Sequence, residues 1–191
     1  VIDTGLDYNH PSFQYPFLYN YDGEKSCAST PQITDYSGYD FVNQDNDIMD
    51  DNGHGTVVTQ IIYRELIARG VDFQILPIKA FDADGKGKYF DIICGFQYAA
   101  YNEDVKIINN SYGFKGTKPL ILEDLMKAAS DKLIIASAGN DGIDTDQGDM
   151  EHMHFPSSYN FTTDTQRYDH LLTVTAMNEE LTDRYKWANY G

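Results

Sequence analysis

The sequence predicts an α/β fold with three layers, in which a mainly parallel β-sheet is flanked by helices. Two observations lead to this prediction. Short apolar runs alternate with segments whose apolar residues recur at helical spacing, which is the pattern of parallel β–α–β units. The 191 residues are 41% hydrophobic, enough for one compact domain with its own core and too little for two.

The first half of the chain begins with a strand and reaches its first helix through a long polar loop. Val1 and Ile2 form the end of a strand, and residues 14–53, rich in Asp, Asn, Ser, Gly and Tyr, are expected to be loop. A helix is predicted over 55–68 and a buried strand over 73–78. The apolar residues at helical spacing are Val57, Val58, Ile61, Ile62 and Leu66.

The second half repeats the alternation. Helices are predicted over 89–101 and 120–131, and strands over 106–109, 133–136 and 171–176. Active sites of parallel sheets gather at the carboxyl ends of the strands. Polar residues that follow a predicted strand are therefore the candidates for function.

The net charge of the chain is −16, from 30 acidic and 14 basic residues. Such a charge repels nucleic acid and anionic membranes, so neither is expected as a partner. It would attract cationic peptides and metal ions, although solubility alone accounts for it. No run approaches the roughly 18 apolar residues of a membrane span, and we expect a monomer.

The two cysteines give little information about the redox compartment. Cys94 lies in an apolar run and is expected to be a core thiol, whereas Cys27 lies in a polar stretch. Nothing in the sequence indicates a disulfide between them.

Three polar residues stand where chemistry is expected. Asp3 follows the first strand, His54 lies between two glycines where the first helix begins, and Asn140 follows the strand 133–136. Each has a simple structural explanation: Asp3 as a turn or cap residue, His54 as a structural histidine, Asn140 as part of an Asn-Asp-Gly turn. Together they supply an acid, a base and an amide that can donate a hydrogen bond to a developing oxyanion.

The surrounding motifs resemble those of the subtilisin-like serine proteases. VIDTG at 1–5, HGT at 54–56 and AGN at 138–140 are similar to the aspartate, histidine and oxyanion blocks of that family, in its order. Nearly the whole chain takes part in the resemblance. The further matching stretches are DYNHP at 7–11, KAFDADG at 79–85, NSYG at 110–113, FPSSY at 155–159 and WANYG at 187–191.

The resemblance implies a serine endopeptidase. Asp3 would orient His54, His54 would act as general base, and Asn140 would stabilise the oxyanion. The block that carries the family's nucleophilic serine has no match among these residues. We therefore expect residues 1–191 to be a single partial domain, incomplete at both ends, with the serine beyond it.

The resemblance also implies where protein or peptide substrates bind. Ser111, Tyr112 and Gly113 would bind substrate backbone, and Ser137, Ala138 and Gly139 would form the facing wall of the main pocket, with His154 near its base. No cofactor is required for the chemistry. The family favours a secreted or cell-envelope location.

Several residues depart from the family pattern. Val57 stands where a second histidine is usual, Gln60 stands where a small residue is usual, and Ser12 replaces a common calcium-ligating Asp. We therefore expect no metal site at Ser12. A structural calcium ion elsewhere in the chain stays possible, although no family motif signals one. Residues 160–169 resemble an insertion.

Two alternatives stay open. A pseudo-protease that binds proteins without cleaving them would keep the fold and lose the serine, but such a chain need not retain Asp3, His54 and Asn140 together. Four carboxylates have spacing that suits calcium, although a solvated acidic loop is the more common reason for such a cluster. They are Asp45, Asp47, Asp50 and Asp51.

Overall fold

The structure is a computed structural model, and it describes residues 1–13, 17–19, 38–160 and 167–191. Cys27 lies outside the described residues, as does most of the expected insertion. The chain divides into two compact units, residues 1–105 and residues 106–191. Each unit is described by itself.

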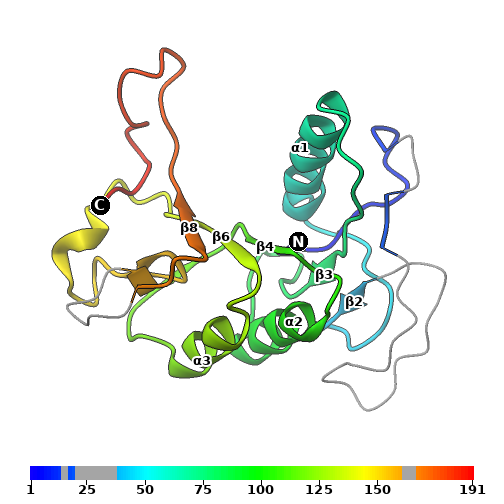
Figure 1. Cartoon of the computed structure of the whole chain (residues 1–191), viewed down its shortest axis with the longest axis horizontal. Helices are drawn as coiled ribbons and strands as arrows, with labels where there is room; N and C mark the ends of the chain where they lie inside the picture. The colour runs from blue at the N-terminus through cyan, green and yellow to red at the C-terminus, as the bar shows by residue number, and fades with distance from the viewer. Residues whose placement is uncertain (14–16, 20–37, 161–166) are drawn as a thin grey trace. The chain divides into compact units, whose positions relative to one another are not determined.

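The described residues of unit 1 form three short parallel strands and two helices (Figure 1). The strand β3 (Ile78–Lys79) pairs in parallel with both β1 (Ile2–Asp3) and β2 (Tyr39–Asp40), so that Lys79 lies opposite Asp3 in one pairing. The helices α1 (His54–Ala68) and α2 (Tyr89–Tyr101) both contact β1, on opposite faces of these strands (Figure 1).

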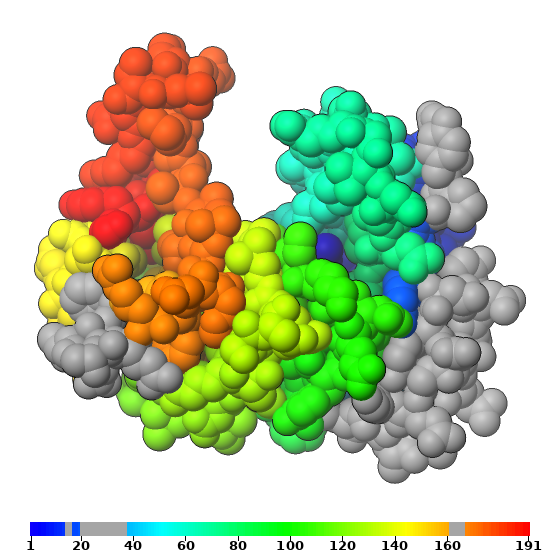
Figure 2. All heavy atoms as spheres, viewed as in Figure 1, coloured from blue at the N-terminus to red at the C-terminus, as the bar shows by residue number. Residues whose placement is uncertain are grey.

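The face that α1 packs into the core of unit 1 is not the apolar face expected from the sequence. The helix buries Gly55, Thr56, Thr59 and Tyr63, whereas Val57 and Ile61 are exposed and much of the helix surface is open in Figure 2. The Tyr63 ring packs against Phe13 and Phe17. A buried apolar cluster, against which Phe13 packs, consists of Leu6, Phe17, Ile48, Tyr63 and Ile75. Cys94 on α2 is buried, as expected.

In the described part of unit 2, three strands pair in parallel. The strand β6 (Leu133–Ser137) pairs with β4 (Ile107–Asn110) and with β8 (Leu171–Val174), and α3 spans Leu120–Ala128. A second, antiparallel pair joins β5 (Phe114–Lys115) to β7 (His154–Phe155). Short 3₁₀ turns follow at η1 (Thr145–Gln147) and η2 (Ser157–Asn160).

Several predictions of secondary structure were wrong in detail. The strand expected over 73–78 is β3, and Ile75 forms only an isolated bridge with Leu18. The expected loop 14–53 contains β2, and β5 and β7 were missed. The helix expected over 120–131 ends at Ala128, before a Ser-Asp pair that favours turns over helix.

The mainly parallel sheet was correctly predicted, since the principal strands pair in parallel within each unit. Among the described residues, no helix is both long and apolar enough to cross a membrane. The single partial domain stays a prediction.

Candidate active site

Asp3 and His54, 51 residues apart in the chain, form a hydrogen-bonded pair in unit 1. His54 Nδ1 lies 2.7 Å from Asp3 Oδ1, and the same oxygen accepts a 2.8 Å bond from the Thr4 N–H. A carboxylate can only accept, so Nδ1 donates this bond, and the second ring nitrogen, Nε2, is left for another partner. The hydrogen bond expected from the two motifs is therefore present.

The two side chains differ in exposure. Asp3 is only 4% exposed at the end of β1, whereas the His54 side chain is 52% exposed at the first position of α1. Burial keeps water away from the carboxylate and strengthens its bond to the imidazole. The hydrogen bond thus fixes Nδ1 of His54, while about half of the His54 side chain stays accessible to a reactant.

Glycines allow β1 and α1 to approach closely enough for this bond. A Cβ on Gly55 would lie 2.3 Å from the Gly5 carbonyl oxygen and 3.1 Å from the Asp3 Cβ. Gly5 adopts φ +116°, and a Cβ there would lie 2.6 Å from the Ile48 carbonyl oxygen. The glycines of the two motifs are therefore steric requirements of the pair.

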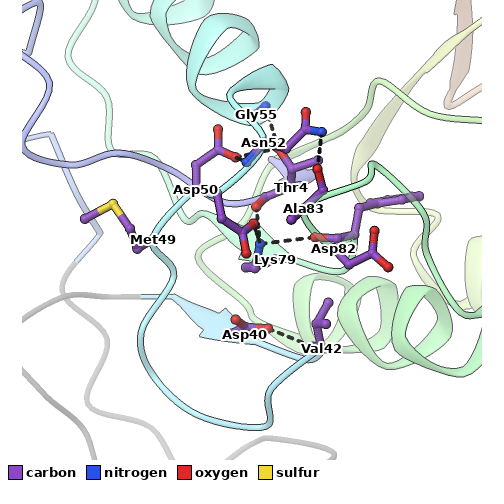
Figure 3. Close-up of polar contacts among 12 residues, drawn as sticks. Thr4, Asp40, Val42, Met49, Asp50, Asn52, Gly55, Lys79, Asp82 and Ala83 are labelled. Atoms are coloured by element: carbon purple, nitrogen blue, oxygen red, sulfur yellow. Dashed lines mark hydrogen bonds and ion pairs between the residues drawn. The ribbon is translucent and has the colours of Figure 1, made fainter.

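Asp50 connects the segments that carry Asp3 and His54, a role that sequence reasoning missed. Its Oδ1 accepts from the Thr4 hydroxyl at 2.9 Å and from the Gly53 N–H at 2.8 Å, and Figure 3 shows Asp50 beside Thr4 and Asn52. Its Oδ2 accepts from the Thr56 N–H and hydroxyl at 2.9 and 2.6 Å. The Thr4 hydroxyl in turn accepts from the Gly55 N–H at 2.9 Å.

The charge of Asp50 is stabilised by these donors. Burial by itself would raise the pKa of Asp50, but the hydrogen bonds from Gly53, Thr56 and Asn52 outweigh burial and lower the pKa to about 2. Its position four residues before His54 was the only available signal, because its partner Thr4 is 46 residues away in sequence.

Lys79 is a buried cation beside the same network (Figure 3). Its Nζ donates to the Thr4 carbonyl at 2.7 Å, to Asp51 Oδ1 at 2.6 Å and to the Phe81 carbonyl at 3.2 Å. Three acceptors compensate for burying the ammonium group. With Asp50 and Asp51 so engaged, the acidic loop is a hydrogen-bonding network, and no group of three or more His, Cys, Asp or Glu in the described ranges is arranged to hold a metal ion.

Gln60 and Ser12, two positions that depart from the family pattern, contact each other. The Gln60 amide donates to the Ser12 hydroxyl at 2.6 Å. The larger side chain on α1 is thus accommodated by a small polar partner.

In unit 2, Asn140 is exposed on the loop that follows β6. Gly139 before it adopts φ +101°, which favours glycine. Asn189, which is fully buried, accepts from the Asp141 and Ile143 N–H groups at 2.9 and 3.2 Å. Its Nδ2 donates to the Ala138 carbonyl at 2.8 Å, so one side chain holds the loop on both sides of Asn140.

The expected substrate-binding segments lie together in unit 2. The Ser137 hydroxyl donates to the Tyr112 carbonyl at 3.3 Å. A Cβ on Gly113 would lie 1.8 Å from His154 Cε1, and a Cβ on Gly139 would lie 2.8 Å from His154 Nε2. The buried imidazole of His154 thus lies between the segment that contains Ser111, Tyr112 and Gly113 and the segment 137–139.

The surroundings of His154 favour its neutral form. Burial lowers the pKa of His154, and the Asp141 carboxylate offsets only part of this effect. Asp141 itself forms a 3.1 Å ion pair with Lys115, and His154 Nδ1 lies 3.0 Å from the Ser157 hydroxyl. The candidate residues therefore form one hydrogen-bonded pair in unit 1 and one cluster around His154 and Asn189 in unit 2.

Comparison with known proteins gives one consistent family. The family model described as the Subtilase family matches residues 1–191. The thermophilic serine proteinase of Bacillus sp. (strain AK1) is 30% identical over 200 residues, which cover 100% of this chain and 40% of the relative. The cell wall-associated protease of Bacillus subtilis (strain 168) is 39% identical over 111 residues, or 55% of this chain and 12% of the relative.

A solved structure supports the same fold. The crystal structure of a cold adapted subtilisin-like serine proteinase matches with a TM-score of 0.70 and 25% identity, covering 100% of this chain and 57% of that chain. The three-layer α/β class predicted from the sequence is confirmed. The chain spans less than half the length of either curated relative.

Proposed function

This chain belongs to the subtilase family, and we propose on that basis that the complete protein is a serine endopeptidase in which Asp3 and His54 are two members of an Asp–His–Ser triad. The single observation that supports this most is the 2.7 Å contact between His54 Nδ1 and the buried Asp3 carboxylate. The nucleophile would be a serine outside these 191 residues.

The proposed first half-reaction is acyl transfer to that serine. The serine Oγ attacks the peptide carbonyl carbon while His54 Nε2 takes the hydroxyl proton. Asp3 stabilises the imidazolium that forms, and the Asn140 amide donates to the oxyanion of the tetrahedral intermediate. The C–N bond then breaks as Nε2–H gives its proton to the leaving amine, and an acyl-enzyme ester remains.

The second half-reaction reverses these roles with water. His54 Nε2 takes a proton from the water molecule as its oxygen attacks the ester carbon. Collapse of the second tetrahedral intermediate returns the proton to the serine Oγ and releases the carboxylic acid. No cofactor enters either step.

The substrate would be an extended protein or peptide segment. Ser111, Tyr112 and Gly113 follow β4 and offer backbone groups to which an extended chain can add as a strand. Ser137, Ala138 and Gly139 form the facing segment, and His154 lies between the two at the base. By analogy with the cell wall-associated relative, we propose a secreted or cell-envelope location.

The proposal is tested by removing His54 from the complete protein. His54→Ala should lower cleavage of an unfolded protein substrate at least about 10⁴-fold, because the serine loses its general base. His152→Ala is the matched control, since His152 forms a similar 2.6 Å contact with Asp149 but lies on an exposed turn. The control should cleave normally.

Two results would reject the endopeptidase. One is a folded wild-type protein that does not cleave and has no serine reactive toward fluorophosphonates, which would favour the binding-only pseudo-protease. The other is cleavage that is unaffected by His54→Ala.

A further inference from the structure

We infer that Asn189 is a positioning residue that aims Asn140 at the oxyanion, an inference that rests on the proposed function. Asn189 is 0% exposed, and its polar groups are directed to the loop between Ala138 and Ile143. The residue belongs to the WANYG stretch, 49 positions after Asn140 in the chain.

The hydrogen bonds of Asn189 bracket Asn140 on both sides. Before Asn140, the Asn189 amide Nδ2 donates to the Ala138 carbonyl at 2.8 Å, and the Asn189 backbone N–H donates to the Gly139 carbonyl at 3.0 Å. After Asn140, the Asn189 Oδ1 accepts from the Asp141 N–H at 2.9 Å. The residues on either side of Asn140 are thus fixed to one side chain and its backbone.

Asn189 is itself held rigidly. The Thr175 hydroxyl donates to the Asn189 carbonyl at 2.6 Å, and a Cβ on Gly139 would lie 2.5 Å from Asn189 Nδ2. Gly139 is therefore required for the amide to approach the loop. Asn140, by contrast, is exposed.

A rigid support beneath an exposed donor is what catalysis by preorganised hydrogen bonds requires. A donor raises the rate only when it already points to the place where charge develops, so that no reorganisation is needed during the reaction. Loss of Asn189 would let the Ala138–Ile143 loop relax. Asn140 would then donate less effectively, although its own side chain is unchanged.

The test is a double-mutant cycle in the complete protein, measured as kcat and KM on one peptide substrate. Asn189→Ala should lower kcat about 10- to 100-fold with little change in KM, because a shift of about 1 Å in a catalytic group costs that much. In an Asn140→Ala background the same substitution should lower kcat by less than about 3-fold, since the group it positions is already absent.

Asn160→Ala is the matched control for a purely structural effect. Asn160 also forms three side-chain hydrogen bonds in unit 2, but to the Tyr168 N–H and to the Tyr168 and Leu171 carbonyls. This variant should leave kcat unchanged. If Asn189→Ala does not fold, Asn189→Ser is carried through the same cycle, because it removes the amide that holds the loop and adds no buried charge.

The outcomes separate the two proposals. A wild-type protein that does not cleave peptides rejects the proposed function. An active wild type in which Asn189→Ala or Asn189→Ser slows the Asn140→Ala protein as much as it slows the wild type overturns the role of Asn189 alone.

Discussion

At the scale of single residues, His54 meets two requirements that usually conflict. One ring nitrogen is held by a buried carboxylate, while half of its side chain stays exposed. Its place at the first position of α1, just after Gly53 with φ +102°, allows both. Asn140 has a similar arrangement, because it is exposed on a loop that hydrogen bonds to the buried Asn189 hold in place.

Replacement of Asn140 should separate binding from catalysis. Because its amide would bond strongly only to the transition-state oxyanion, Asn140→Ala should lower kcat by about 10²–10³-fold and leave KM nearly unchanged. Steady-state kinetics of the complete protein on a chromogenic peptide measure both constants. A rise in KM with unchanged kcat would place Asn140 in ground-state binding instead.

At the scale of elements, the sequence predicted helices better than strands, for a physical reason. The helix α2 has the bounds expected, since 13 residues carry a clear apolar period. β1, β2, β3, β5 and β7 each contain two residues, too few for any alternation to be seen. Their positions depend on partners far away in the chain, such as Ile2 opposite Ile78.

The site residues also divide into those that local sequence predicts and those that depend on distant partners. Asp3, His54 and Asn140 stand in short motifs that can be recognised locally. Asp50 and Asn189 act through partners 46 and 48 residues away. Asp50 lies in an acidic loop, and Asn189 lies in the WANYG stretch, for which the resemblance implied no catalytic or binding role. Such roles could be found only from the folded chain.

The start of α1 should be sensitive to acid through Asp50. Because its pKa in the folded chain is about 2, below the roughly 3.9 of an unfolded Asp, its contribution to stability is present above about pH 4 and is lost as the pH falls toward 2. Asp50→Asn cannot accept all of its bonds and should lower the free energy of unfolding by about 1–3 kcal/mol at pH 6.

Urea unfolding of the complete protein from pH 6 to pH 2.5 tests this. The difference between wild type and Asp50→Asn should shrink as the pH falls. Asp84→Asn, in which only an exposed ion pair with Lys86 is lost, is the control and should differ little at any pH. A difference that stays constant or grows in acid would contradict the role given to the Asp50 charge.

The close contact between Gly113 and His154 gives a second test at this scale. Gly113→Ala should lower the free energy of unfolding by about 1–3 kcal/mol, because the new Cβ would lie 1.8 Å from the buried ring. In a His154→Ala background the same substitution should cost much less. Equal costs in the two backgrounds, measured by urea unfolding, would show that the ring does not lie against Gly113.

At the scale of the whole molecule, the chain combines the fold of its family with a strongly acidic composition. The net charge of −16 is compatible with solubility and with attraction of cationic peptide segments. The chain matches its family over all 191 residues yet spans only part of its relatives. The serine required by the proposed triad is therefore the link that most needs a direct measurement.

That measurement is labelling of the complete protein with a fluorophosphonate probe, followed by mass spectrometry of the modified peptide. The proposal predicts one equivalent of label on one serine outside residues 1–191, and loss of labelling in His54→Ala, because the serine is activated only by that imidazole. His152→Ala should label like the wild type. A folded protein that takes up no label, or one that labels equally well without His54, would contradict the proposed triad.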